Sequence, residues 1–348
     1  MKKRKAFVIG GVNVEPGQNT VVDLPVSVLS NHIPVNMPVY VKHGKFEGPT
    51  VFVSAVIHGD EVLGVEIIRR LIKSMTKKRL HGTLLCIPIV NAFGFIGHSR
   101  YLPDRRDLNR CFPGNAKGSL AGQLANLFME EIVSRCDLGI DLHSAAQNRN
   151  NLPQIRISSN RQETIDLAEA FGAPVIVQAG LREGSLRYAA KKRGVDVLLY
   201  EGGEGLRFDE LTIRVGLTGI LRILRSLGAL SARSVPLAKN KSYWSQISRW
   251  TRAPEGGILR CRKKLGDIVA KGEVIGIISD PFGNVEFEVE ANNAGLIIGK
   301  TNLPIVNQGD ALYHIAELID EQREEVPIIE QMENELMTDS MYDEDEII

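Results

Sequence analysis

The sequence lacks a hydrophobic run long enough to cross a membrane, because charged residues, Gly or Pro interrupt every long segment of Val, Ile and Leu. Its four cysteines lie far apart and form no CxxC pair, which argues against both a disulfide framework and a thiolate metal site. The basic first residues precede a short apolar run that ends at two glycines, without a convincing cleavage site. These absences predict a cytoplasmic protein with reduced thiols and no membrane partner.

The formal net charge is zero, but this balance averages two unlike parts. Residues 317–348 hold thirteen Asp and Glu and only one basic residue, Arg323. The remainder holds 41 basic and 29 acidic residues, a surplus of 12 positive charges. These Lys and Arg are scattered without aromatic residues between them or a known binding motif, so we predict no nucleic-acid partner.

Short apolar runs alternate with longer amphipathic segments from residue 50 to about 228, which is typical of an α/β sheet with helices packed on it. We therefore expect a mixed central sheet with helices on both faces, in a domain spanning residues 1–234. A helical pattern ends at Gly228, a residue type that favours helix C-termini. The predicted strands are residues 49–57, 83–90, 137–143 and 195–201, and the predicted helices follow residue 61 and span residues 119–136 and the segment before Gly228.

Short β-like runs separated by Gly follow, and predict a small all-β domain over residues 235–317. Its Lys-Leu-Gly-Asp-x-Val-x-Lys-Gly phrase resembles the barrel-sandwich modules of biotinyl and lipoyl carriers. A carrier needs a lysine in its hairpin, and none occurs between Gly272 and Gly299. We therefore predict a module that carries no cofactor, followed by an acidic, mobile tail over residues 318–348.

His58 and Glu61 follow a buried strand and open a helix, so both side chains can reach one ion at the carboxyl end of that strand. By itself this pair is also compatible with an ordinary helix start, where Glu61 is favoured by the helix dipole. His143 lies where another apolar strand ends, at the same edge of the sheet. Two His and one carboxylate leave a position open on zinc for water, as in catalytic sites.

Further polar residues follow other strands of the same sheet. Asn109 and Arg110 lie in a long loop, and they could anchor an acidic group of a substrate or form a surface salt bridge. Asp141 could orient a His ring or simply end its strand. Glu201 ends the strand at 195–201 and is a candidate general base, with Glu204 in the same loop as its rival.

The motifs HGDE, NAFGF, SRY, DLNRCFPG, DLHS and YEGGE occur in the order seen in the succinylglutamate desuccinylase and aspartoacylase family, which the chain resembles over about residues 35–205. The resemblance implies a zinc carboxypeptidase-like fold with one zinc ion per chain, held by His58, Glu61 and His143. It also implies that Glu201 is the catalytic carboxylate and that Asn109 and Arg110 bind a substrate carboxylate. Arg100 would polarise the carbonyl group that is attacked.

The predicted function is zinc-dependent hydrolysis of an amide, with a small N-acyl amino acid as substrate and partner, and with a homo-oligomer as a possible assembly. A metallocarboxypeptidase is the alternative enzyme, because the same site would suit the C-terminal residue of a peptide. A zinc-binding regulatory protein without catalysis is the alternative of another class. A zinc titration and a panel of N-acyl amino acids would distinguish these three.

Overall fold

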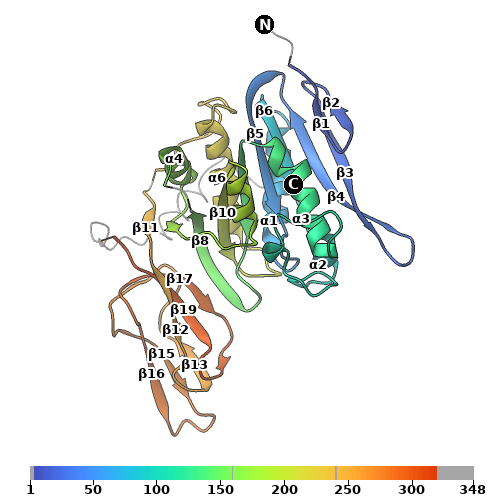
Figure 1. Cartoon of the computed structure of the whole chain (residues 1–348). Coiled ribbons are helices and arrows are strands. Elements are labelled where there is room, and N and C mark those ends of the chain that lie inside the picture. Colours follow the sequence, from blue (N-terminus) through green and yellow to red (C-terminus); the bar gives the residue numbers. More distant parts are fainter. Residues whose placement is uncertain (1–3, 159, 240, 320–348) are drawn as a thin grey trace.

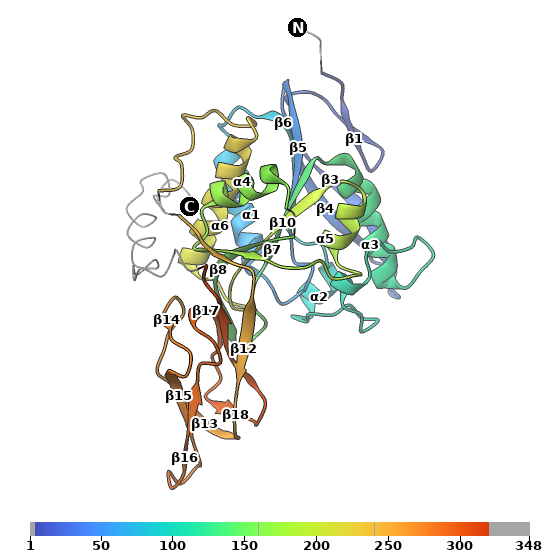
Figure 2. The ribbon, with the colours of Figure 1, turned by 60° about the vertical axis from the view of Figure 1, so that its left-hand side comes forward.

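A computed structural model describes residues 4–158, 160–239 and 241–319 of the chain. An α/β part and a smaller group of C-terminal strands that projects from it make up the molecule (Figure 1), and the projection is also clear after a 60° turn (Figure 2). Of the predicted acidic tail, residues 320–348 lie outside the described residues. In the part of the chain that the structure describes, no helix has the length and apolarity to span a membrane.

The α/β part is built on a mixed sheet in the order β3-β4-β6-β5-β7-β10-β8. The neighbours β6, β5, β7 and β10 run parallel, while β3 and β4 run antiparallel to their neighbours and β8 runs antiparallel to β10. At its edge, β8 continues in parallel to β9 and β11. The bounds are β3 Asn19–Val28, β4 Pro34–His43, β5 Phe46–Ala55, β6 His81–Ile87, β7 Leu138–His143, β8 Arg149–Ile157, β9 Val175–Gln178, β10 Asp196–Gly203 and β11 Tyr243–Ser245.

Helices cover both faces of this sheet, which confirms the predicted fold class. One buried core joins the sheet to α1, α4 and α6, and a second core joins its other face to α3 and α5. The predicted helix over residues 119–136 is an α-helix followed by a separate 3-10 turn. The bounds are α1 Leu63–Met75, α2 Ala92–Ile96, α3 Leu120–Glu131, α4 Gln162–Phe171, α5 Leu186–Lys192 and α6 Glu210–Ser226, with 3-10 turns η1 Leu108–Arg110 and η2 Val133–Arg135.

Helix α1 packs closely on the two strands that lead into the predicted site. Its buried residues Leu63, Ile67 and Leu71 recur at helical spacing, so one stripe of the helix faces the sheet. A Cβ atom on Gly64 would lie 2.6 Å from the Cβ of Ala55 and 2.9 Å from that of Leu142. The missing side chain therefore lets the first turn of α1 lie against the ends of β5 and β7.

The C-terminal strands form two antiparallel layers around a shared apolar core, in agreement with the predicted small all-β domain. One layer has the order β16-β15-β13-β18, and the other contains β12, β19, β17 and β14. An N-terminal hairpin, β1 Phe7–Ile9 and β2 Val12–Val14, lies at the other end of the chain. The remaining bounds are β12 Ser248–Arg252, β13 Gly257–Cys261, β14 Ile268–Val269, β15 Val274–Ser279, β16 Glu286–Glu290, β17 Gly295–Thr301, β18 Ile305–Val306 and β19 Ala311–Ala316.

The two parts share one continuous sheet. Strand β17 pairs with β8 through Gly299 and Asn151, next to the segment of β8 that pairs with β9. The C-terminal strands are therefore attached to the strand that borders β10, which carries Glu201. The division of the chain at residue 234 stays a prediction.

Candidate active site

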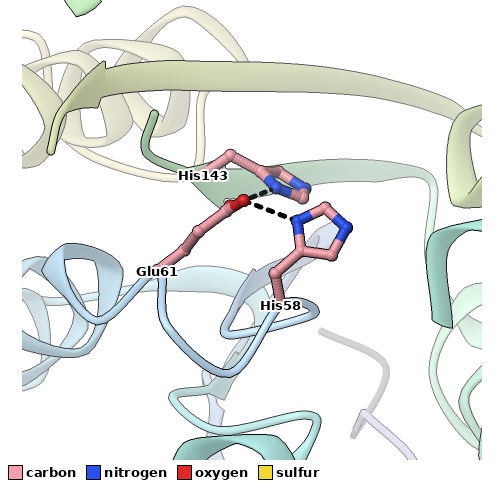
Figure 3. A group of neighbouring side chains, drawn as sticks. All are labelled: His58, Glu61 and His143. Atoms are coloured by element: carbon pink, nitrogen blue, oxygen red, sulfur yellow. Dashed lines mark hydrogen bonds and ion pairs between the residues drawn. The ribbon is translucent and has the colours of Figure 1, made fainter. Parts of the chain in front are cut away.

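His58, Glu61 and His143 converge at the carboxyl ends of β5 and β7, as Figure 3 shows. Nδ1 of His58 lies 2.6 Å from Oε1 of Glu61, and Nδ1 of His143 lies 2.6 Å from its Oε2. All three side chains are buried, and one ligand atom from each lies within 4.8 Å of the others. The structure thus brings together the three residues that the sequence singled out as metal ligands.

The backbone that delivers His58 turns sharply after β5. Val56 is fully buried and has φ = 60°, a left-handed conformation that a β-branched residue rarely adopts. Asn91 stabilises the turn, because its backbone N–H donates to the Val56 carbonyl at 2.9 Å and its side-chain Oδ1 accepts from the N–H of Gly94. The loop between His58 and Glu61 is therefore held by the segment that follows β6.

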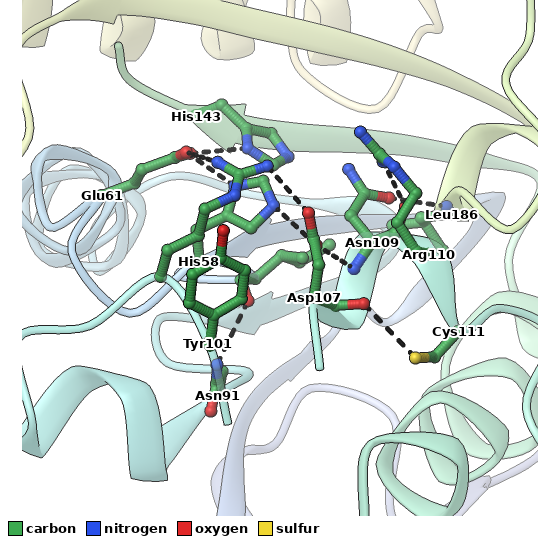
Figure 4. Close-up of polar contacts among 12 residues, drawn as sticks. His58, Glu61, Asn91, Tyr101, Asp107, Asn109, Arg110, Cys111, His143 and Leu186 are labelled. Atoms are coloured by element: carbon green, nitrogen blue, oxygen red, sulfur yellow. Dashed lines mark hydrogen bonds and ion pairs between the residues drawn. The ribbon is translucent and has the colours of Figure 1, made fainter. Parts of the chain in front are cut away.

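The outer nitrogen of each imidazole faces an aspartate. Nε2 of His143 lies 2.8 Å from Asp141, whose other carboxylate oxygen accepts from the hydroxyl of Ser54 at 2.8 Å. Nε2 of His58 lies 3.1 Å from Asp107, in the long loop before η1 (Figure 4). A carboxylate in this position fixes the ring orientation and leaves Nδ1 to bind an ion. The sequence suggested this role for Asp141, but gave no signal for Asp107.

Opposite charges stabilise one another in this cluster. Burial raises the pKa of Glu61, but the two imidazoles outweigh it and hold the pKa well below its usual range. Burial lowers the pKa of His143, yet Asp141 and Glu61 raise it well above its usual value. The site therefore favours positive charge between the rings and the Glu61 carboxylate.

This arrangement fits a zinc ion. Two imidazole nitrogens and one carboxylate form the ligand set of many catalytic zinc sites. Both rings already present the same nitrogen, Nδ1, to the shared carboxylate, and both outer nitrogens have acidic partners. A cation bound there would replace protons on the two rings.

A cavity of about 350 Å³ opens beside the three residues and is lined by Glu201. Glu201 forms an ion pair with Arg156 of β8, with 2.7 Å between Oε2 and Nε. Glu204 has other partners: its carboxylate accepts from the N–H of Asn148 and from the side chain of Asn302. Glu201 thus lies in the cavity, whereas Glu204 links two loops.

The three other predicted site residues also line this cavity. Arg100 donates to Glu61 at 3.3 Å and to Asp107 at 3.0 Å. The Oδ1 of Asn109 accepts from the N–H of Leu186 at the start of α5 (Figure 4), which leaves its Nδ2 for a ligand. The guanidinium of Arg110 donates to the Asn109 carbonyl.

Arg156, Arg182 and Arg187 also line the cavity, although the sequence did not single them out. Nη1 of Arg187 is buried and has no hydrogen-bond partner among the described residues. Burial lowers the pKa of Arg187, and the neighbouring Arg156 lowers it further. An anionic ligand would relieve this unpaired charge.

Fold and site together are those of a hydrolase-type α/β protein with a buried His-Glu-His cluster. The profile of the succinylglutamate desuccinylase/aspartoacylase catalytic domain matches residues 47–227, and the chain belongs to this family. The match runs from β5 to the end of α6 and includes every predicted site residue.

Relatives extend the similarity to most of the chain. The chain is 26% identical over 300 residues to the N-alpha-acetyl-L-2,4-diaminobutyric acid deacetylase of Halomonas elongata, covering 83% of this chain and 86% of that protein. A succinylglutamate desuccinylase/aspartoacylase from Rhodobacter sphaeroides superposes with a TM-score of 0.76 at 25% identity, over 87% of this chain and 96% of that chain. The product-bound ectoine utilization protein EutE (DoeB) of Ruegeria pomeroyi has the same fold, with a TM-score of 0.75 at 23% identity over 86% and 94% of the two chains.

Proposed function

We propose that this protein is a zinc-dependent amidohydrolase that removes the acyl group from a small N-acyl amino acid. The observation that carries the proposal is the buried cluster of His58, Glu61 and His143, which opens into a cavity that also contains Glu201. Family membership and a relative named as a deacetylase support the reaction type. We assign the metal to these three residues.

The metal and the carboxylates have separate tasks in this proposal. A zinc ion in such a site supplies Lewis acidity, which lowers the pKa of water to about 7 and polarises a carbonyl group. Glu201 takes up the proton of the attacking water and returns it to the departing amine. Its ion pair with Arg156 fixes the position of the carboxylate before the substrate binds.

The substrate's carboxylate is assigned to the arginine side of the cavity. Arg100 and Arg156 already have acidic partners, whereas the guanidinium groups of Arg110 and Arg187 have no ion pair among the described residues. A guanidinium binds a carboxylate through two parallel hydrogen bonds, and the free Nδ2 of Asn109 can add a third contact. Arg100 is assigned to the carbonyl oxygen, beside Glu61.

Metal analysis combined with a substrate panel tests this function. We expect about one zinc ion per chain, loss of hydrolysis on chelation and recovery on adding zinc. N-acyl amino acids should be cleaved, while the same compounds with the carboxylate converted to an amide should react at least about tenfold more slowly, since they lose the pairing with arginine. Blocked dipeptides form the control for a carboxypeptidase. Hydrolysis that survives complete removal of the metal would contradict the proposal.

A further inference from the structure

A second cavity, of about 380 Å³, lies at the opposite end of the central sheet. It is bounded by the end of β4, the first residue of β5 (Phe46) and the segment between α1 and β6. The His58 loop follows the other end of β5, which at ten residues is roughly 30 Å long. This cavity is therefore separate from the candidate active site. We call it the Lys42 cavity.

Four cationic side chains line the Lys42 cavity: Lys42, Lys45, Lys78 and Arg79. Lys42 of β4 pairs with Asn19 of β3, so the register of these two strands places both residues at the cavity. Lys78 and Arg79 belong to the basic stretch after α1. In the sequence alone, such a charge run indicates only an exposed segment. The fold thus brings together cations from two segments that are far apart in the sequence.

Lys42 is the unusual member of this group. Its side chain is almost completely buried, with 7% of the residue exposed, and it has no hydrogen bond or ion pair with any described residue. Burial lowers the pKa of its amine. Two cations that are equally buried have partners: Arg214 pairs with Glu210, and Arg222 donates to backbone carbonyls. The amine nitrogen itself is not sealed from solvent, so the charge at the end of this buried stem faces the cavity, where a ligand can reach it.

No acidic side chain among the described residues lines this cavity to supply a counter-charge. Glu47 lies nearby, but its side chain is 81% exposed and it approaches Arg4 at 3.8 Å. Among the described residues, the amine of Lys78 donates only to the Ser234 carbonyl, at 3.4 Å. The Lys42 cavity therefore has a surplus of positive charge that a ligand can neutralise.

Arg79 is held in place by aromatic contacts. Its guanidinium carbon lies 3.8 Å from the centre of the Phe46 ring, and His81 stacks on that ring with 5.1 Å between the centroids. Such a cation–π contact orders the arginine without using its N–H donors. Its donors stay available to a ligand in the cavity.

We propose that the Lys42 cavity is a binding site for a small phosphate-bearing metabolite. Lysine amines bind phosphate as point charges, and the arginine adds directional donors for its oxygens. The volume exceeds that of a bare phosphate, so it suits a phosphate monoester or a diphosphate. Because Lys42 is buried inside the cavity, a small ligand reaches it, whereas the phosphates of a nucleic acid or a membrane would contact only the rim.

Calorimetric titration of the full chain with inorganic pyrophosphate, at constant ionic strength, tests this site. We expect binding to the unmodified protein and an affinity at least about tenfold lower in Lys42→Met and Lys45→Met. Lys117→Met removes the same charge from an exposed loop elsewhere and should bind as the unmodified protein does. Lys42→Met should retain its hydrolytic activity, because the two cavities lie at opposite ends of β5.

Two results would overturn the proposal. One is an absence of pyrophosphate binding at concentrations up to about 10 mM, far above the range of a specific metabolite site. The other is equal affinity in Lys42→Met and the unmodified protein, which would assign the bound ion to the arginines of the active site, where it would also compete with substrate. Should Lys42→Met fail to fold, the exposed Lys45 decides the question by the same comparison.

Discussion

The two cavities at the ends of β5 differ in how their charged side chains are paired. Around the candidate metal centre, Glu61 faces two imidazoles and Arg100, and Arg156 pairs with Glu201. In the Lys42 cavity, cations gather without a carboxylate from the part of the chain that the structure describes. Paired charges can hold their geometry without a ligand, whereas the cations of the Lys42 cavity, like Arg110 and Arg187 beside the metal centre, are left for a ligand to neutralise. The comparison teaches that the first cavity is organised in advance for chemistry, and the second for binding.

Breaking the most strongly paired cluster should have the largest effect. His143→Ala removes one of the three proposed metal ligands and leaves Glu61 and Asp141 without the imidazole that they share, so we expect zinc to be lost and hydrolysis to fall by more than about 100-fold. Elemental analysis and steady-state kinetics measure both. The exposed His98, replaced by Asn, is the control. Full zinc occupancy in His143→Ala would show that the ligands have been misassigned.

Neutralising Glu201 should separate metal binding from catalysis. Glu201→Gln keeps the shape of the side chain but cannot accept a proton, so kcat should fall by about 10² to 10⁴ while zinc is retained. Glu204→Gln is the matched control, because Glu204 bonds to Asn148 and Asn302 instead of facing the cavity. If Glu204→Gln were the inactive variant, the general base would have to be reassigned.

His314 of β19 is a buried imidazole that stays neutral instead of pairing with an opposite charge. Burial, and then Arg156, lower the pKa of His314 to about 4. In the unfolded chain the value is about 6.5, so between these pH values only the unfolded state takes up the proton. Stability should therefore be fully present above about pH 6.5 and fall by up to about 3 kcal/mol as the pH approaches 4.

Denaturant unfolding at several pH values measures this effect. His314→Gln should unfold with a weaker dependence on pH over this window than the unmodified protein, because the replaced side chain does not titrate. The ring of His314 stacks on Trp250 with 4.7 Å between the ring centroids, so the variant is expected to be less stable at neutral pH. The informative quantity is therefore the slope of the free energy of unfolding against pH. Parallel curves for the two proteins would rule out His314 as the titrating group.

The smallest expected effect lies in the Lys42 cavity. Without pyrophosphate, Lys42→Met removes an amine that has no partner among the described residues but faces solvent through the cavity, and it keeps most of the buried apolar chain. Unfolding should therefore cost up to about 1 kcal/mol more than in the unmodified protein. Lys117→Met should change stability by less than about 0.5 kcal/mol, as is usual for exposed positions. A Lys42→Met protein that is less stable than the unmodified one would mean that the amine already has a stabilising partner.

The fold and the convergence of His58, Glu61 and His143 could be predicted from the sequence because their signals are local. His58 and Glu61 are three residues apart after an apolar strand, and His143 ends another, so parallel strands bring them to one edge. The helix ending near Gly228 was also predicted, and Gly228 adopts φ = 71°, as expected just after a helix.

The arginines and the Lys42 cavity could not be predicted in this way. Arg187 becomes a cavity residue because α5 packs on the sheet. Lys42 and Lys78 line the same cavity because β4 pairs with β6, the strand that follows Lys78. Such positions depend on contacts between distant segments, and a lone Arg or Lys carries no local pattern. The antiparallel β8, which contributes Arg156, was likewise not predicted.

The pairing of β17 with β8 has a consequence for local opening of the molecule. The C-terminal strands cannot separate from the α/β part without breaking the backbone ladder between Gly299 and Asn151, a few residues before Arg156 on the same strand. The rate of amide hydrogen exchange depends on which segments open together as a cooperative unit, and such a unit can include segments that are far apart in the sequence. The amides of β17 and of the first half of β8 should therefore exchange at similar rates. Because Arg156 lies on β8, slow exchange in these strands means that the strand holding the Arg156–Glu201 pair stays ordered.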